Sequence, residues 1–491
     1  MKPNRPHREP SGLLRALLRG VLMVLLLLAC RPVFAQPLPE LHTAAEVRRL
    51  TTEQAERHYP VRLRGVITFF DQSQFFRFLQ DDTAGIYFFL DTTNAAHHAL
   101  LRAGQQVEIQ GQTSKGEYAP IVNAQRIHVL GPGRFLAAKS VTFEQLASGQ
   151  EDSQFVAVHG LVRSVRFDER TKYFQIDIAT GGGRLTAQAA SLPLVRGDGL
   201  VDSTVTVQGA CLTRFNGQRQ LFDVRLLVPR PEDFIVEQPA PQDPFGIPTQ
   251  KISSLLQFNP QGHHGHRAKV GGTVIYRLNE GALYIQDQSE GIYVETQQPG
   301  WLRVGDQVEV LGFPARGDYT PMLQDARFRK IGFGPAPEPD RITADEALKG
   351  THDCRLVCLE ATVLDRAQHS REQFLVLQAG GSIFRAYLEQ PGSAPAFEDL
   401  ENDSKVAVTG VCRIETGSEW HSGQDWRASS FRLLLRSPAD VQVLQAPSWW
   451  TLKKLLWMVG MLGVVVLGAF VWVGVLRQRV QQQTRIIGQK L

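Results

Sequence analysis

The chain has 491 residues, of which 53 are Lys or Arg and 49 are Asp or Glu, for a formal net charge of +4. The first 35 residues hold six basic residues and one acidic residue, and the segment after Ser448 holds six basic residues and none that is acidic. The region between these ends therefore has 41 basic against 48 acidic residues, a net charge of −7. Nucleic-acid binding gains much of its affinity from neutralised phosphates, so this acidic region argues against nucleic-acid partners.

The N-terminus has the pattern of a secretory leader. Basic residues from Lys2 to Arg19 precede an apolar run over residues 20–29, and Ala35 supplies a small residue at a suitable cleavage position. We expect residues 1–35 to be a signal peptide cleaved after Ala35. The alternative is a lipoprotein signal acylated at Cys30, and both interpretations stay open.

The region after the leader contains a long internal repeat. Residues 78–87 (FLQDDTAGIY) match residues 284–293 (YIQDQSEGIY), and residues 104–111 match 305–312. A second kind of unit repeats too, because residues 205–211 match 406–412. The order is A-B-A-B, and repeats of this length without a catalytic motif indicate paired binding domains.

Within each unit, apolar residues alternate with polar ones over short runs broken by Gly, Asp and Asn. This pattern predicts half-buried antiparallel strands, and units with about five strands predict small closed barrels. The predicted segments are a helical segment over 36–60, barrel A1 over 61–137, a linker helix with barrel B1 over 138–230, a proline-rich linker over 231–266, barrel A2 over 267–335, and a linker helix with barrel B2 over 336–446. We expect one helix over residues 43–58 and short capped helices near 141–149 and 342–350.

The C-terminal region predicts one membrane span. Residues 455–476 carry no charge over 22 residues, a helix of about 33 Å, and Trp449 and Trp450 precede them. More basic residues follow the span than precede it, which predicts a transmembrane helix over 449–476 and a cytoplasmic helical stub over 477–491. In the stub, apolar residues and one Thr are spaced for pairing with a second helix, so we expect a homodimer. These residues are Val480, Thr484, Ile487 and Leu491.

Several features occur together: the leader, tandem units with Gln-Asp-x-(Ser/Thr)-x-Gly-Ile-Tyr, the LRSPADV run over 435–441, the Trp-Trp pair, and the LRQRVQQQT run over 476–484. Together they resemble the input region of a family of bacterial membrane-bound two-component sensor histidine kinases. The resemblance covers nearly the whole chain. It implies a mainly β fold of four tandem OB-like barrels outside the inner membrane and one C-terminal transmembrane helix.

The resemblance also implies a function in signal transduction. The sequence holds no phosphoacceptor His in the tail and no ATP-binding motif, so we expect no kinase activity in this chain. We expect a non-catalytic periplasmic sensor or ligand-binding region that relays a signal to a cytoplasmic kinase or response regulator. The alternatives are an envelope scaffold or adhesion protein and, with less support, a surface hydrolase.

Corresponding loops of the two B units carry the candidate ligand-binding residues. Exposed aromatic, amide and guanidinium groups offer a flat apolar face beside hydrogen-bond donors, as recognition of a small molecule, a glycan or an envelope protein requires. The alternative is a hairpin tip with packed aromatic residues. The candidates are Phe215, Asn216 and Arg219 in the first B unit, Trp420 and Trp426 in the second, and Tyr118 and Tyr319 in the A units.

Cysteines and possible metal ligands allow two interpretations each. Cys358 and Cys412 are expected on neighbouring strands of the last barrel and are the predicted disulfide, but buried apolar cysteines are equally compatible with the sequence. Asp81 and Asp287 precede the repeated Gly-Ile-Tyr and are interpreted as turn residues rather than cation ligands. The histidine cluster at 263–266 is interpreted as a solvated loop, so no metal site and no cofactor are predicted.

Overall fold

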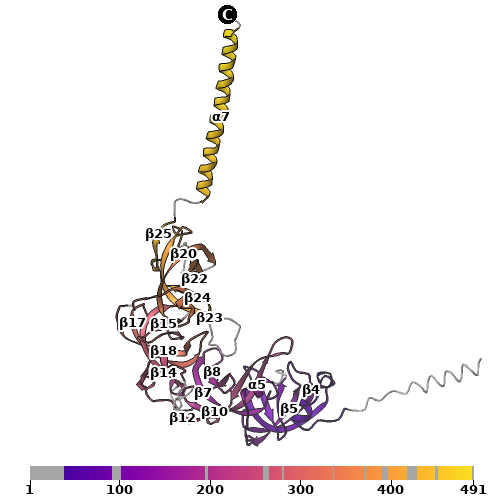
Figure 1. Ribbon diagram of the computed structural model, residues 1–491. Coiled ribbons are helices and arrows are strands. Elements are labelled where there is room, and N and C mark those ends of the chain that lie inside the picture. Colours follow the sequence, from indigo (N-terminus) through magenta and orange to yellow (C-terminus); the bar gives the residue numbers. More distant parts are fainter. Residues whose placement is uncertain are drawn as a thin grey trace, which may run out of the picture. The chain divides into compact units, whose positions relative to one another are not determined.

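The computed structural model describes residues 38–90, 101–193, 197–257, 265–278, 281–335, 337–369, 372–389, 396–416, 428–447 and 452–488. The chain is mainly β and contains five-stranded barrels in succession (Figure 1). Contacts divide it into two compact units, the first holding barrel A1 and most of B1, and the second holding A2, B2 and the C-terminal helix. The predicted leader, residues 1–35, lies outside the described residues.

The strands of the first unit are as follows. Barrel A1 consists of β1 (Pro60–Asp71), β2 (Phe76–Gln80), β3 (Gly85–Leu90), β4 (Gln105–Ser114) and β5 (Ile121–Pro132). Barrel B1 consists of β7 (Phe155–Asp168), β8 (Tyr173–Ala179), β9 (Arg184–Ala189), β10 (Thr204–Phe215) and β11 (Leu221–Val228), with β6 (Lys139–Ser140) beside β7.

The strands of the second unit repeat this plan. Barrel A2 consists of β14 (Ala268–Arg277), β15 (Ala282–Gln286), β16 (Gly291–Glu295), β17 (Asp306–Arg316) and β18 (Pro321–Phe333). Barrel B2 consists of β20 (Leu356–His369), β21 (Glu372–Ala379), β22 (Ser382–Glu389), β23 (Lys405–Thr416) and β24 (Ala428–Leu435), with β19 (Asp340–Arg341) beside β20 and β25 (Val441–Gln445) beside β23.

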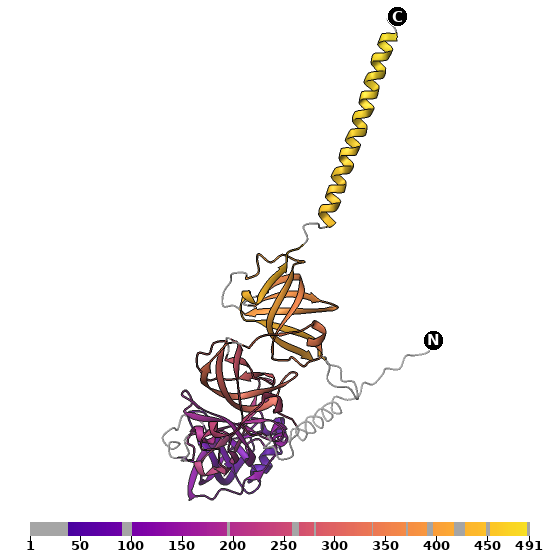
Figure 2. The same cartoon turned by 60° about the vertical axis from the view of Figure 1, so that its left-hand side comes forward.

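Each barrel has the same strand order. Its five strands neighbour one another in the order first, second, third, fifth, fourth, and the fourth strand pairs with the first to close the barrel. The third and fifth strands are parallel, as β16 with β18 and β22 with β24. Closure removes the exposed strand edges, which explains how strands with one apolar face stay soluble in such small units. Figure 2 shows the strands of B2, in orange, wrapped around one core.

Alternation along the strands fills each barrel. In B2, Val357, Leu359, Ala361 and Val363 of β20 all face the core, which includes Phe384 of β22 and Phe431 of β24 stacked at 4.6 Å between ring centroids. Burial of these apolar side chains, at about 25 cal/mol per Å², is the main force that folds each barrel. The predicted tandem OB-like barrels are confirmed.

The short connecting helices form as predicted between the A and B barrels. α5 (Phe143–Ala147) and α6 (Ala344–Leu348) each begin with a capping box, in which Thr142 or Thr343 accepts a hydrogen bond from the third helical residue. The expected single helix over 43–58 is wrong. The segment forms α2 (Ala44–Arg48) and α3 (Thr52–Ala55), because Thr51 starts a new capping box and ends the first helix.

The predicted proline-rich linker contains short regular elements. β12 (Phe234–Gln238) extends the B1 sheet beside β10, and β13 (Thr249–Gln250) pairs in parallel with β14 of A2. Short 3-10 turns at Pro231–Asp233, Pro244–Gly246 and Ile252–Ser254 occupy part of the remainder. Proline supplies a fixed backbone angle for such turns but no N–H for a long strand, which accounts for their shortness.

The C-terminal helix α7 (Leu452–Gly488) is continuous over 37 residues. Its segment Leu455–Gln483 is, within the described ranges, the one helix that is long and apolar enough to cross a membrane. Its apolar side chains are exposed in the structure, whereas those of a core helix would be buried. The predicted single C-terminal apolar helix is confirmed, and it includes most of the predicted stub.

The repeated Gln-Asp motif joins the barrels of each pair. Gln80 ends β2, and its Oε1 accepts a hydrogen bond from the backbone N–H of Phe155, the first residue of β7, at 2.7 Å. Gln286 ends β15, and its Oε1 accepts from the N–H of Leu356, the first residue of β20, at 3.0 Å. The same side chain thus fixes the same contact in both pairs, which we call the first joint (A1 with B1) and the second joint (A2 with B2).

The glycine of the motif permits the close approach of the two barrels. A Cβ on Gly85 would overlap the carbonyl oxygen of Ser153, and a Cβ on Gly291 would overlap that of Cys354. Glycine is the residue that allows two backbones to come this close. The repeat of Gly in both copies is therefore explained by contact with the following barrel.

We expect Gly291→Ala to destabilise the second joint by about 1–3 kcal/mol, because the added methyl group must displace backbone atoms. Thermal unfolding of the full chain in detergent measures this as a lower Tm. Gly381→Ala is the matched control, since a Cβ there meets no atom within 4 Å. Equal melting temperatures for the two variants would contradict the assigned role of Gly291.

Candidate functional site

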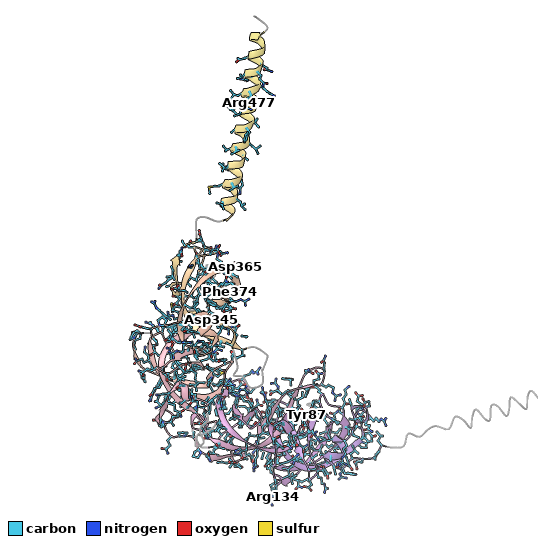
Figure 3. The ribbon with its side chains drawn as sticks, viewed as in Figure 1. Tyr87, Arg134, Asp345, Asp365, Phe374 and Arg477 are labelled. Atoms are coloured by element: carbon cyan, nitrogen blue, oxygen red, sulfur yellow. The ribbon has the colours of Figure 1, made fainter. Side chains whose placement is uncertain are left out.

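The two joints are built alike but lined differently. In the first joint, an aromatic and aliphatic cluster fills the space between the barrels. Phe69 and Tyr173 lie with their ring centroids 6.3 Å apart, and the Tyr173 hydroxyl donates to Asp71 Oδ2 at 2.6 Å. Phe78 packs edge-on against Tyr87, which Figure 3 labels, at 5.5 Å. The first joint therefore holds a packed aromatic and aliphatic cluster.

Polar residues replace apolar ones at corresponding positions of the second joint. Tyr276 and Tyr284 stand where the first joint has Phe69 and Phe78. Arg413 follows Cys412 on β23 just as Leu212 follows Cys211 on β10. Glu372 opens β21, as Tyr173 opens β8. The second joint keeps a packed cluster of its own, which includes Tyr276, Tyr284 and Val411. The exchanges therefore add charged and hydroxyl groups beside that cluster.

A cavity of about 370 Å³ occupies the second joint. This volume lies within the range of small-molecule sites, which is about 300–1,000 Å³. Barrel A2 contributes Leu278, Tyr284, Tyr293, Gly317, Asp318, Thr320 and Met322, and barrel B2 contributes Glu372, Tyr387, Glu389, Arg413, Arg432 and Leu434. The lining therefore combines aromatic surface with five ionisable side chains of both signs besides the tyrosines, and we call it the joint pocket.

Two pairs of like charges face the joint pocket from barrel B2. Glu372 of β21 lies directly opposite Glu389 of β22 in the strand register. Arg413 of β23 lies directly opposite Arg432 of β24. Like charges opposite each other across two strands repel, and each arginine also has an acidic neighbour: Asp318 at 2.7 Å from Arg413 and Glu415 at 3.9 Å from Arg432. Two such pairs in one cavity make it the candidate site among the described residues.

Arg413 is the most buried charged group of the pocket, with 9% of its surface exposed. Its Nη2 donates to Asp318 Oδ2 at 2.7 Å and its Nη1 to the Cys354 sulfur at 3.2 Å, while its Nε has no hydrogen-bond partner. Its guanidinium carbon lies 5.6 Å from the ring centres of both Tyr284 and Tyr293. The tyrosine faces thus hold the guanidinium in place beside the cavity.

The protonation of these groups follows from burial and neighbouring charge. Burial lowers the pKa of Arg413, but the adjacent Cys354 thiol, Tyr284 and Asp353 outweigh burial and raise the pKa, so the arginine stays charged. Burial raises the pKa of Tyr284, and the cation of Arg413 opposes the increase only in part. The pocket therefore offers a fixed positive charge and neutral tyrosine hydroxyls at ordinary pH.

Barrel B2 supports the pocket with packed aromatic residues on its outer face. Phe374, labelled in Figure 3, is two residues after Glu372 and so points to the same side of β21. Its ring lies 5.5 Å from that of Tyr387, whose face also meets the Arg432 guanidinium carbon at 5.9 Å. These contacts hold Tyr387 between the acidic and basic pairs.

The candidate residues predicted in the first unit are packed together. The rings of Tyr118 and Phe215 stack 6.0 Å apart with an angle of 9°. Arg219 donates to the carbonyl oxygens of Glu117 at 3.0 Å and Tyr118 at 3.2 Å. The Asn216 side chain bonds within its own hairpin, to Gln220 at 3.0 Å. Their hydrogen bonds and stacking favour the packed-hairpin interpretation for this loop.

The remaining predicted residues lie beside the pocket or outside the described part. Tyr319 is half-buried between the pocket residues Asp318 and Thr320, packed against the B2 core. Trp420 and Trp426 fall in residues 417–427, outside the described ranges. Sequence reasoning missed the pocket residues themselves, although a comparison of the two copies position by position would have revealed Arg413 and Glu372.

The predicted Cys358–Cys412 disulfide is not formed. Both thiols are free, as are those of Cys211 and Cys354. The two residues do lie on adjacent strands, but Cys358 is opposite Thr409, three residues from Cys412. Cys412 belongs to the B2 core while Cys358, flanked by core residues on both sides, points away from it. The alternating strand geometry therefore keeps the two sulfur atoms on opposite faces.

The aspartates of the repeated motif form turns, as predicted. Oδ1 of Asp81 and of Asp287 accepts hydrogen bonds from the backbone N–H groups two and three residues later, at 2.6–2.9 Å. Burial would raise the pKa of Asp287, but the N–H of Ile252, which donates to Oδ2 at 2.9 Å, and the turn donors outweigh burial and lower the pKa. In the histidine cluster, His266 Nδ1 lies 2.9 Å from Asp202 Oδ1, and residues 263 and 264 lie outside the described ranges.

No protein-family model and no curated protein matches the chain. Among solved structures, an OBody bound to hen egg-white lysozyme is similar over 22% of this chain and 98% of its own, with 17% identity and a TM-score of 0.17. An aspartyl tRNA synthetase from Entamoeba histolytica is similar over 22% of this chain and 23% of its own, with 12% identity and a TM-score of 0.16. A murine DNA binding protein bound with double-stranded DNA covers 37% of this chain and 98% of its own, with 11% identity and a TM-score of 0.21. Similarities at this level carry no argument about function.

Residues of the first joint can be placed at the corresponding positions of the joint pocket, and the stability of that variant tests whether the charges hold the joint together. We expect the double variant Glu372→Tyr with Arg413→Leu to melt at the same temperature as the wild type or up to several degrees higher. It removes one partner of each like-charge pair, and Asp318, whose side chain is 71% exposed, stays solvated without Arg413. Circular dichroism melting of the full chain in detergent measures the change.

The reverse exchange in the first joint serves as the control. Tyr173→Glu places a carboxylate in a packed site, where Tyr173 is 7% exposed, and should lower stability by about 2–4 kcal/mol. A clear loss of stability in the Glu372→Tyr, Arg413→Leu variant would show that these charges hold the joint together, and would contradict a ligand-binding role.

Proposed function

We propose that this chain is a non-catalytic, ligand-binding sensor region of a membrane-anchored signalling protein, with its ligand bound in the joint pocket. The observation that supports this most is the difference between the two joints. Duplication supplied the same joint twice, and the copy next to the apolar helix in the sequence has a cavity lined by two pairs of like charges. Binding sites keep such unfavourable arrangements because a ligand compensates them.

The location we propose is the bacterial inner membrane, with the barrels in the periplasm and the C-terminus in the cytoplasm. Support comes from the apolar segment of α7 and from the basic residues Arg477 and Arg479, which follow its uncharged part. Arg477 is labelled on the helix in Figure 3. The net negative charge of the region between leader and helix is compatible with this orientation, because the positive-inside rule concerns only the Lys and Arg residues close to the ends of the membrane span.

The signal would pass through α7 to a cytoplasmic kinase or response regulator. α7 continues as one helix from the apolar segment to Gly488, so a displacement at its outer end reaches the tail without an intervening loop. Pairing of two chains along the helix and its tail would convert a ligand-dependent change between barrels A2 and B2 into a small shift or rotation of the helix pair.

Cysteine labelling tests the orientation. We expect Glu401→Cys, on an exposed turn of B2, to react with a membrane-impermeant maleimide in intact spheroplasts. Gln482→Cys, near the end of α7, should react only after lysis. The unsubstituted chain is the background control, because three of its four described thiols are buried. Labelling of Gln482→Cys in intact spheroplasts would contradict the proposed topology.

A thermal-shift screen tests the binding function. With a chemically diverse library of metabolites and the full chain in detergent, we expect at least one compound to raise the Tm of the wild type by about 4 °C or more at saturating concentration. The same compound should leave the Glu372→Tyr, Arg413→Leu variant unchanged. If every active compound shifts both proteins equally, or if no compound is active, the joint pocket is not a sensor site.

A further inference from the structure

We propose that the joint pocket binds a zwitterionic ligand with well-separated charges, and that short peptides with free termini are the class it fits. This inference rests on the proposed binding function and specifies its ligand. It depends on where the two like-charge pairs lie on the outer face of barrel B2. The acidic pair occupies β21 and β22, and the basic pair occupies β24 and β23. Because these strands neighbour one another in the order β21-β22-β24-β23, the pocket has an acidic half and a basic half.

Uncharged side chains separate the two halves. Tyr387 of β22 lies opposite Leu434 of β24 in the register, and both line the pocket. Across the cavity, barrel A2 presents Tyr284 and Tyr293, with ring centroids 5.2 Å apart. The middle of a bound ligand would therefore meet aromatic and aliphatic surface with hydroxyl groups, which suits the side chains and amides of a peptide.

The spacing of the two halves sets the length of the ligand. Arg432 lies opposite Arg385 in the register of β24 with β22, and Glu389 is four residues further along β22. At 3.3 Å per residue this is roughly 13 Å along the strands, shortened by the reach of the two side chains into the cavity. An α-amino acid cannot touch both halves, whereas an extended dipeptide or tripeptide spans about 7–10 Å.

Each end of a peptide compensates one unfavourable pair. A terminal carboxylate between Arg413 and Arg432 would accept hydrogen bonds from two guanidinium groups, since neither Nε donates a hydrogen bond and the ion pair of Arg432 with Glu415 is long, at 3.9 Å. A terminal ammonium group at the acidic half would meet the carboxylates of Glu372 and Glu389, which lie opposite each other in the strand register. A ligand with a single charge meets an opposite charge in only one half of the pocket, so the arrangement favours both charges on one molecule.

Asp318 shows how the basic half is occupied before a ligand arrives. Its carboxylate accepts a hydrogen bond from Arg413 at 2.7 Å, yet its side chain is 71% exposed and belongs to the loop between β17 and β18. An incoming carboxylate can take its place, because Asp318 returns to solvent while the buried Arg413 keeps a carboxylate partner. Exchange of carboxylates at Arg413 would also alter the contact between barrels A2 and B2.

Thermal shift and calorimetric titration with defined pools test the ligand class. The probes are an equimolar pool of tripeptides with free termini, the same pool N-acetylated, the same pool C-amidated, and a pool of single amino acids. With the full chain in detergent, the free tripeptides should raise the Tm by about 4 °C or more, and each capped pool and the amino acids should lose at least nine-tenths of the affinity.

Variants assign the effect to the pocket. Arg432→Gln should remove the response to free tripeptides, and Glu372→Gln with Glu389→Gln should make the N-acetylated pool bind as well as the free pool. Arg225→Gln is the matched control, because Arg225 occupies the corresponding position of β11 in barrel B1, and it should bind like the wild type.

The outcomes separate this inference from the proposed function. If free tripeptides bind and Arg432→Gln abolishes binding, both stand. If tripeptides fail while another compound binds in a manner that depends on Arg413 and Glu372, the sensor function stands and the peptide class is overturned. Equal binding of free and capped pools would contradict the claim that the ligand must carry both charges. Binding that survives both in Arg432→Gln and in the Glu372→Tyr, Arg413→Leu variant would contradict the claim that the ligand binds in the joint pocket.

Discussion

The organisation of this chain depends on one close approach between backbones. The strand that begins at Gly85 or Gly291 meets the start of the following barrel so closely that a side chain would overlap it. A glutamine amide at the end of the preceding strand then supplies the hydrogen bond that sets the register between the two barrels. Packed side-chain clusters add to this contact in both joints. This backbone contact brings the two barrels of each pair together, and the side chains between them differ between the two joints.

Duplication explains why the two spaces can be compared residue by residue. The first joint is filled by Phe69, Phe78 and Tyr173, and its barrels gain stability from that packing. The second joint keeps the same glycine and glutamine but carries Arg413 and Glu372 in its lining. Since the backbone contact is unchanged, the polar lining cannot be attributed to a different architecture. The difference that the strand register shows is the exchange of Leu212 for Arg413 and of Tyr173 for Glu372.

The fold was predictable because it depends on local patterns. Alternation of apolar residues along the strands, the repeat, and the uncharged run in the last helix each act over a few residues to a few tens of residues, so they are legible in the sequence. The helix over 43–58 failed because the capping box at Thr51 outweighed the apolar spacing. The disulfide failed because adjacency of strands does not fix the face to which each cysteine points.

The site was less predictable because it depends on contacts between barrels. Arg413 and Glu372 are ordinary strand residues when each is considered alone, and only the register places them beside Arg432 and Glu389. The exposed-aromatic criterion instead selected Tyr118 and Phe215, which stack on each other. A buried charge opposite a like charge is a better criterion, but it requires the pairing of strands that are distant in sequence.

Amide hydrogen exchange of the full chain, with and without the free tripeptide pool, tests most directly whether the second joint is an open binding site and the first is closed. The account predicts slower exchange in β15, β16, β22 and β24, which line the joint pocket, and no change in β2, β3 and β8 of the first joint. Protection that appears equally in both joints, or that is confined to the hairpin between β10 and β11, would contradict it.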